Sequence, residues 1–174
     1  MIAPLVHRPT LPPRIKRFLF NNFFSILINW ISEDSWWENI DRKSYAFMND
    51  PSSWTEAVTK CQTMKGRLFE PKDEGTNKKV FDFFFDKGMA MVPGAWIGVT
   101  IANGVKDTAV YNSDQSPVHS DVGFDVVIPK TIWAPGQPDN GGSKEDCVSW
   151  NTNVKDWNDA DCSREMPFVC EKGK

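Results

Sequence analysis

Six carboxylates are crowded into a short stretch near the C-terminal end of the 174-residue chain. They are Asp139, Glu145, Asp146, Asp156, Asp159 and Asp161. Two cysteines, Cys147 and Cys162, lie within this stretch or directly after it. Like charges held close together repel one another unless a cation balances them. The cluster therefore indicates that this part of the chain binds a metal ion.

The rest of the composition argues against other kinds of site. The chain has two histidines, His7 and His119, which are far apart in the sequence. This disfavours a histidine-rich zinc site and a nucleophile activated by histidine. The net charge of −3 disfavours a nucleic-acid partner. No apolar run reaches the roughly 18–20 residues that a membrane-spanning helix needs.

The four cysteines form an even set without a C-x-x-C pair: Cys61, Cys147, Cys162 and Cys170. With no histidine nearby, a zinc site is a poor interpretation of this pattern. Disulfide bonds formed in an oxidising compartment are favoured over free buried thiols. Four cysteines permit three pairings, and the spacing alone does not choose among them.

The elements that must position these groups follow an α+β pattern. Ser53 and Glu56 form a capping box, which predicts the start of a helix over residues 54–64. A second helix is expected over residues 77–87, ending before Gly88. Buried strands are expected later, at residues 96–99, 109–111, 148–150 and 168–170. Between them, residues 112–146 form a long irregular region, which is typical of a functional loop or of disorder.

Residues 1–32 differ from the rest of the chain in charge. They carry four basic residues and no acid, so residues 33–174 carry the balance of −7. A basic patch is followed by the apolar residues 18–31, as in a secretory signal or a signal-anchor. A poorly ordered start, or a segment that packs on the domain, is the alternative. The domain itself is expected over residues 33–174.

Several short motifs occur in the order found in C-type lectin-like domains. They are Trp54-Thr-Glu-Ala, Gly66-Arg-Leu, Trp96-Ile-Gly, Trp133-Ala-Pro-Gly-Gln-Pro-Asp139, Glu145-Asp-Cys147, Trp157-Asn-Asp159 and Pro167-Phe-Val-Cys-Glu171. The chain resembles this family from about Trp37 to Glu171. The resemblance implies the double-loop lectin fold, with two helices, small antiparallel sheets and a long calcium-binding loop region.

The resemblance also implies how the cysteines pair. Cys61 would bond to Cys170 and close the domain, and Cys147 would bond to Cys162 and hold the long loop. Ser44 stands where the long form of the family has a further cysteine, so the chain resembles the short form.

The resemblance implies one principal Ca²⁺ site, whose ligands would also bind the sugar. These residues are Gln137, Asp139, Glu145, Asn158 and Asp159. All of them offer oxygen atoms, which Ca²⁺ prefers. A cis peptide bond before Pro138 would turn the side chains of Gln137 and Asp139 to the same side. We expect Asp159 to be a surface loop residue whose replacement leaves the fold intact. We expect Trp96, Trp133, Trp150 and Trp157 to pack in the core.

The function that the resemblance implies is calcium-dependent carbohydrate binding by a secreted protein that is not an enzyme. In the family, Gln-Pro-Asp accompanies galactose or N-acetylgalactosamine, so terminal galactose-type glycans are the expected partners. A membrane is a partner only if residues 18–31 act as an anchor, and an oligomer is possible. The alternatives are binding to protein or mineral surfaces, and a carboxylate-pair glycosidase. A bound metal would occupy the acids that a glycosidase needs.

Overall fold

The computed structural model describes residues 37–116, 118 and 132–173. The segment 1–32, with its predicted signal or anchor, lies outside the described residues, as do residue 117 and residues 119–131 of the irregular region 112–146. Among the described helices, none is both long enough and apolar enough to span a bilayer.

Both expected helices are present, and side-chain caps explain where they begin. Helix α2 (Trp54–Thr63) starts at Ser53, whose hydroxyl accepts from the Glu56 amide while Glu56 accepts from the Ser53 amide. Helix α3 (Glu74–Asp86) starts three residues earlier than expected. Asp73 caps it by accepting a hydrogen bond from the Thr76 amide at 2.7 Å. A short 3₁₀ helix, η3 (Met89–Met91), follows.

The strands form one mixed sheet with the order β1-β2-β8-β4-β6-β7. Strand β3 pairs with β8, and β5 pairs with β4. All pairs are antiparallel except β4 with β8, which meet at Trp96 and Phe168. The bounds are β1 (Glu38–Ile40), β2 (Lys43–Ser52), β3 (Arg67–Leu68), β4 (Gly94–Ala102), β5 (Val105–Tyr111), β6 (Cys147–Asn151), β7 (Asp156–Ala160) and β8 (Met166–Gly173). The α+β lectin fold is thus confirmed, with a mixed sheet in place of small antiparallel ones.

Four strands were not expected from the sequence: β1, β2, β3 and β7. Strand β2 contains Asn49, Asp50 and Pro51, which are typical of turns. Strand β7 has the sequence Asp-Trp-Asn-Asp-Ala, which also favours a turn when taken alone. Their pairing partners, β8 and β6, decide their conformation.

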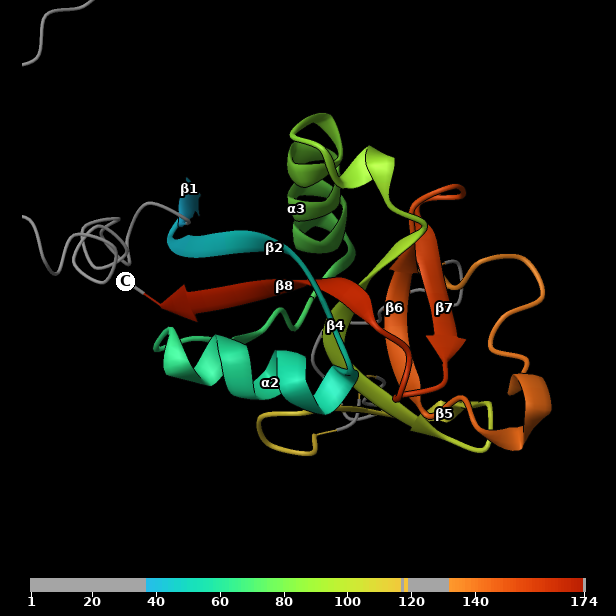
Figure 1. Ribbon diagram of the computed structural model, residues 1–174. Helices are drawn as coiled ribbons and strands as arrows, with labels where there is room; N and C mark the ends of the chain where they lie inside the picture. The colour runs from blue at the N-terminus through green and yellow to red at the C-terminus, as the bar shows by residue number, and fades with distance from the viewer. Residues whose placement is uncertain (1–36, 117, 119–131, 174) are drawn as a thin grey trace, which may run out of the picture. The chain divides into compact units, whose positions relative to one another are not determined.

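The two helices cover opposite faces of the sheet, as Figure 1 shows for α3 and α2 on either side of β8. On the α3 side, Phe81 packs in a buried cluster that includes Ile97 and Trp150. On the α2 side, Ala57 packs in a cluster with Trp96 and Phe168. Trp96 and Ile97 are neighbours in β4, so they point to opposite faces. Each helix therefore has its own buried cluster.

Two disulfide bonds join the described cysteines in the pairing that the resemblance implies. Cys61 of α2 bonds to Cys170 of β8 across 109 residues of sequence. Cys147, at the start of β6, bonds to Cys162, just after β7. The second bond therefore closes the end of the hairpin that these two strands form.

A single buried amide joins helix α3 to this hairpin. The Oδ1 atom of Asn77 accepts hydrogen bonds from the indole nitrogens of Trp150 at 2.9 Å and Trp157 at 3.1 Å. Both tryptophans are fully buried, and Asn77 is almost so. Asn77 therefore fixes the position of β6 and β7 relative to the core.

Asn77→Leu should lower the free energy of unfolding by about 2–6 kcal/mol. The substitution leaves two buried N–H donors without an acceptor, and each such donor costs about 1–3 kcal/mol. The matched control is Lys78→Leu, at the next position of α3, which is exposed. This variant loses only the surface ion pair of Lys78 with Asp82, which is worth about 0.3–0.5 kcal/mol. Urea unfolding measures both, and equal stability of the two variants would contradict the role of Asn77.

Candidate functional site

The loop before β6 is attached to strand β7 by backbone and ring contacts. The Ala134 amide donates to the Trp157 carbonyl at 2.8 Å, and the Trp133 and Trp157 rings meet edge to face at 5.6 Å. The peptide bond between Gln137 and Pro138 is cis. A 3₁₀ turn, η5 (Gly141–Ser143), follows before the chain enters β6. The loop therefore returns to β7 with the motif residues beside that strand.

Asp159 lies at the centre of this arrangement and is fully buried in β7, where it pairs with Val148 of β6. Its Oδ1 accepts from the Asp139 amide at 3.2 Å, and its Oδ2 accepts from the Asn140 amide at 2.8 Å. The prediction that Asp159 is a surface loop residue was therefore wrong. Strand pairing on one side and the loop on the other enclose the carboxylate.

Three of the predicted ligands come together around Asp159. One carboxylate oxygen from each of Asp139, Glu145 and Asp159 lies within 4.8 Å of the others. Asp139 is exposed, Glu145 is half-buried and Asp159 is buried, so the group forms a shallow site that opens to solvent on one side. Three negative charges at this spacing repel one another, and a bound cation would offset that repulsion.

The two amide residues of the predicted set, Gln137 and Asn158, are close in sequence to two of these carboxylates. The Gln137 Oε1 atom is buried and has no hydrogen-bond partner in the described structure. The Asn158 side-chain amide contacts the backbone carbonyl of Asp159. A buried carbonyl oxygen without a hydrogen-bond partner costs free energy. A cation or a hydrogen-bond donor at the Oε1 atom of Gln137 would offset that cost. Together with the carboxylates this is an all-oxygen donor set, which fits Ca²⁺.

Backbone contacts shape the loop around Glu145. The Gly141 amide donates to Glu145 Oε2 at 2.7 Å, and the Glu145 amide donates to Asn140 Oδ1 at 3.1 Å. A side chain at Gly141 would place its Cβ 2.9 Å from the same carboxylate oxygen. Asn140 and Gly141 therefore support the site, a role that sequence motifs alone did not indicate.

The electrostatics of the metal-free site are unfavourable for ionised Glu145. Partial burial raises the pKa of its carboxyl group, and the negative charges of Asp159 and Asp139 raise it further. The Gly141 amide acts in the opposite direction and lowers the pKa. The raised pKa means that folding disfavours the ionised form of Glu145 when no metal ion is bound.

The remaining residues singled out in the sequence lie outside this group. The side chain of Asp146 is exposed, while Asp156 and Asp161 are half-buried and do not belong to the carboxylate group. All four tryptophans that were expected to pack are buried: Trp96, Trp133, Trp150 and Trp157. Those four side chains therefore do not offer a surface on which a sugar could stack.

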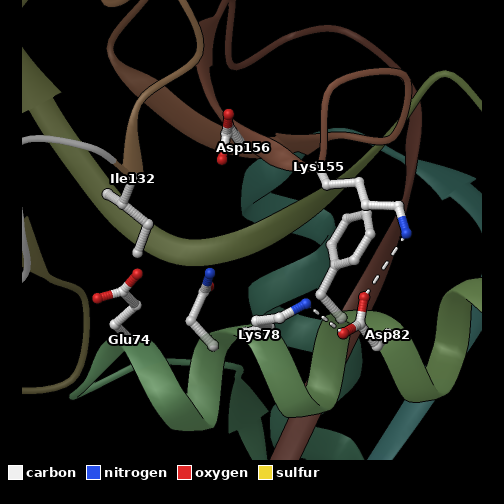
Figure 2. A pocket seen from close by; sticks show the side chains of 8 residues that line it. Glu74, Lys78, Asp82, Ile132, Lys155 and Asp156 are labelled. Carbon is white, nitrogen blue, oxygen red and sulfur yellow. Dashed lines mark hydrogen bonds and ion pairs between the residues drawn. The ribbon is translucent and has the colours of Figure 1, made fainter.

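A cavity of about 170 Å³ lies beside α3, away from the carboxylate group, and is shown in Figure 2. Asp82 pairs there with Lys78 at 2.7 Å and with Lys155 at 3.7 Å. Across the cavity, partial burial raises the pKa of Asp156. Asn77 is one of the residues that line this cavity, and no member of the carboxylate group lines it. The cavity therefore lies where α3 packs against β7.

Comparison with known proteins agrees with the fold and with the motifs. The model of the lectin C-type domain family matches residues 50–172. Collectin-10 of Xenopus tropicalis is 30% identical over 131 residues, which are 75% of this chain and 42% of that protein. C-type lectin domain family 4 member K of Mus musculus is 28% identical over 137 residues, which are 78% of this chain and 37% of that protein. The chain spans less than half the length of these curated relatives.

Solved structures give the same result. The mouse scavenger receptor C-type lectin carbohydrate-recognition domain superimposes with a TM-score of 0.63 at 25% identity, covering 79% of this chain and 95% of that one. Human lithostathine superimposes with a TM-score of 0.63 at 20% identity, covering 80% and 98%, a likeness of fold alone. With the family match, the two disulfide bonds and the mixed sheet, the chain belongs to the C-type lectin domain family.

Proposed function

We propose that this domain is a calcium-dependent carbohydrate-binding module and not an enzyme. The observation that carries the proposal is the group of carboxylates of Asp139, Glu145 and Asp159, whose oxygens lie within 4.8 Å of one another, together with the buried, unpartnered Oε1 of Gln137. Oxygen donors arranged in this way bind a hard divalent cation. C-type lectin domains generally bind Ca²⁺, and the mouse receptor domain that superimposes on this chain is named as carbohydrate-recognising.

Asp139, Glu145 and Asp159, with the side-chain oxygens of Gln137 and Asn158, would hold the ion, which would supply a positive charge that attracts the hydroxyl groups of a sugar. The protein residues orient that sugar through their remaining hydrogen-bonding capacity. Asp139 and Glu145 accept hydrogen bonds from sugar hydroxyls, while the amide groups of Gln137 and Asn158 donate them. No bond is broken in this process, so the site needs neither a nucleophile nor a general acid.

The order of amide and acid in the Gln137-Pro138-Asp139 motif favours galactose or N-acetylgalactosamine over mannose. In the family this order accompanies sugars with an axial 4-hydroxyl group. The loop that follows, residues 140–144, contains no aromatic residue that could stack on the apolar face of galactose. We therefore expect galactose-type selectivity to be modest.

Two disulfide bonds favour an oxidising compartment, so we also propose that the domain works outside the cell. Terminal galactose-type glycans are its proposed partners. Single lectin sites bind weakly, and assembly into an oligomer would raise the overall affinity.

Asp159→Ala and Asp139→Ala should both weaken Ca²⁺ binding by at least tenfold, but only the first should destabilise the calcium-free domain. Losing the Asp159 carboxylate leaves the partly buried backbone N–H groups of Asp139 and Asn140 without an acceptor, at about 1 kcal/mol or more each. Asp139 is exposed, so its removal should cost less than about 0.5 kcal/mol. Calorimetric titration and urea unfolding in chelator test the pair, and equal stability would refute the supporting role of Asp159.

Glu145→Gln should have opposite effects on stability with and without calcium. In chelator, the raised pKa of Glu145 means that the unfolded state loses its proton first, so the wild type loses stability as pH rises from about 4.5 through the raised value. The variant lacks this loss and should melt at a higher temperature at pH 7. In Ca²⁺ at a hundred times its Kd the wild type gains about 2.7 kcal/mol, and the order reverses.

The measurement is the Tm of both proteins at several pH values, with Ca²⁺ and with chelator. Asp114→Asn, outside the site, is a matched neutralisation that should leave the Ca²⁺-dependent increase in Tm unchanged. If Glu145→Gln were the less stable protein in chelator at pH 7 as well, the proposed repulsion would be wrong.

The exchange Gln137→Glu with Asp139→Asn should move the sugar preference toward mannose. It reverses the positions at which the site offers donors and acceptors. A glycan array run with Ca²⁺ and with chelator measures this, and binding by both proteins should disappear in chelator. Equal binding of mannose and galactose by the unmodified protein would show that the motif does not set specificity. Undiminished binding in chelator would overturn the calcium site.

A further inference from the structure

We propose that the hairpin formed by β4 and β5 holds the loop 137–146 in its metal-binding conformation, with Gly104 and Asp146 as positioning residues. This inference rests on the proposed function, because the loop it supports is the proposed calcium site. None of the hairpin residues belongs to the ligand set. Their contribution is the placement of the loop, and so of the ligand Glu145 relative to Asp159.

The turn of this hairpin is tight and held in one shape. Strands β4 and β5 are joined by Asn103 and Gly104, and Ala102 pairs with Val105. Both turn residues have positive φ, 54° and 69°, which is typical of the Asn-Gly turn in two-residue hairpins. The Thr108 hydroxyl oxygen accepts from the Ala102 amide at 2.7 Å and lies 2.7 Å from the Val105 carbonyl. The turn therefore has a fixed conformation against which the neighbouring loop can pack.

Two hydrogen bonds join the hairpin to the residue directly after Glu145. The Ile101 amide donates to the Asp146 carbonyl at 3.0 Å, and the Asn103 amide donates to Asp146 Oδ1 at 3.3 Å. The backbone of Asp146 is thus attached to β4, and its side chain is attached to the turn between β4 and β5. This attachment fixes the point at which the loop turns into β6.

Gly104 contacts the loop at a second point, where there is no room for a side chain. A Cβ atom at Gly104 would lie 2.6 Å from the Cβ of Asn140 and 3.2 Å from its nitrogen. Asn140 connects two proposed ligands, because its amide donates to Asp159 and its side chain accepts from the Glu145 amide. Displacing Asn140 would therefore break its hydrogen bonds to both ligands and shift the loop that carries Glu145 away from Asp159.

Gly104→Ala should weaken Ca²⁺ binding at least tenfold, as measured by calorimetric titration. The matched control is Gly142→Ala, which lies in the loop itself. Gly142 has nearly the same φ, 65°, so both substitutions impose similar backbone strain. A Cβ at Gly142 has no neighbour within 4 Å. Equal Kd values for the two variants would overturn the proposal.

A second pair of variants tests the Asp146 contact without adding bulk. Asp146→Asn and Asp146→Ala remove the same charge, but only asparagine keeps an oxygen that accepts from the Asn103 amide. We expect the Kd for Ca²⁺ to be about fivefold weaker in the alanine variant than in the asparagine variant. Identical affinities would contradict the role of this hydrogen bond.

Amide hydrogen exchange in chelator separates this inference from the proposed function. In the calcium-free protein, the Asn140 and Glu145 amides should exchange faster in Gly104→Ala than in wild type or Gly142→Ala. Unchanged exchange in Gly104→Ala would overturn the inference even if calcium binds. If the wild type bound no calcium, the proposed function would fail, while faster exchange would still support the hairpin as the element that holds the loop.

Discussion

The burial of one carboxylate, that of Asp159, is the constraint on which the site depends. A buried charge is stable only if hydrogen bonds and a counter-charge compensate its loss of water. The backbone amides of Asp139 and Asn140 supply the hydrogen bonds, which obliges the loop to fold over strand β7. The counter-charge is what the proposed Ca²⁺ would provide. The other two carboxylates gather at the same place because the loop has been drawn there.

The strand that carries Asp159 is held from its far side by the core. Asn77 binds the indole groups of Trp150 and Trp157, one from each strand of the β6–β7 hairpin. The bond between Cys147 and Cys162 closes the end of that hairpin. The contacts that stabilise strand β7 are therefore made by α3 and the sheet, and not by the loop 137–146. The loop above it depends on local hydrogen bonds, so it is the part of the domain that a metal ion can stabilise most.

A stable core combined with a loop held by local contacts fits a binding domain whose specificity depends on that loop. The scaffold places one buried acid at a fixed point, and short-range contacts of Asn140, Gly141 and Gly104 shape the rest. Substitutions in the exposed motif can then alter the ligand preference without unfolding the domain. The buried acid does not have this freedom, because the fold and the site share it.

The sequence alone determined the parts that local patterns or ordered motifs encode. The capping box located helix α2, and the motifs identified the family, the disulfide pairing and the three carboxylates that the structure brings together. Tertiary structure decided the rest. The segment around Asp159 favours a turn by composition, and only its pairing with β6 makes it a strand and buries the acid. The contact between Gly104 and Asn140 likewise joins distant segments, because the folded backbone, and no local preference, brings them together.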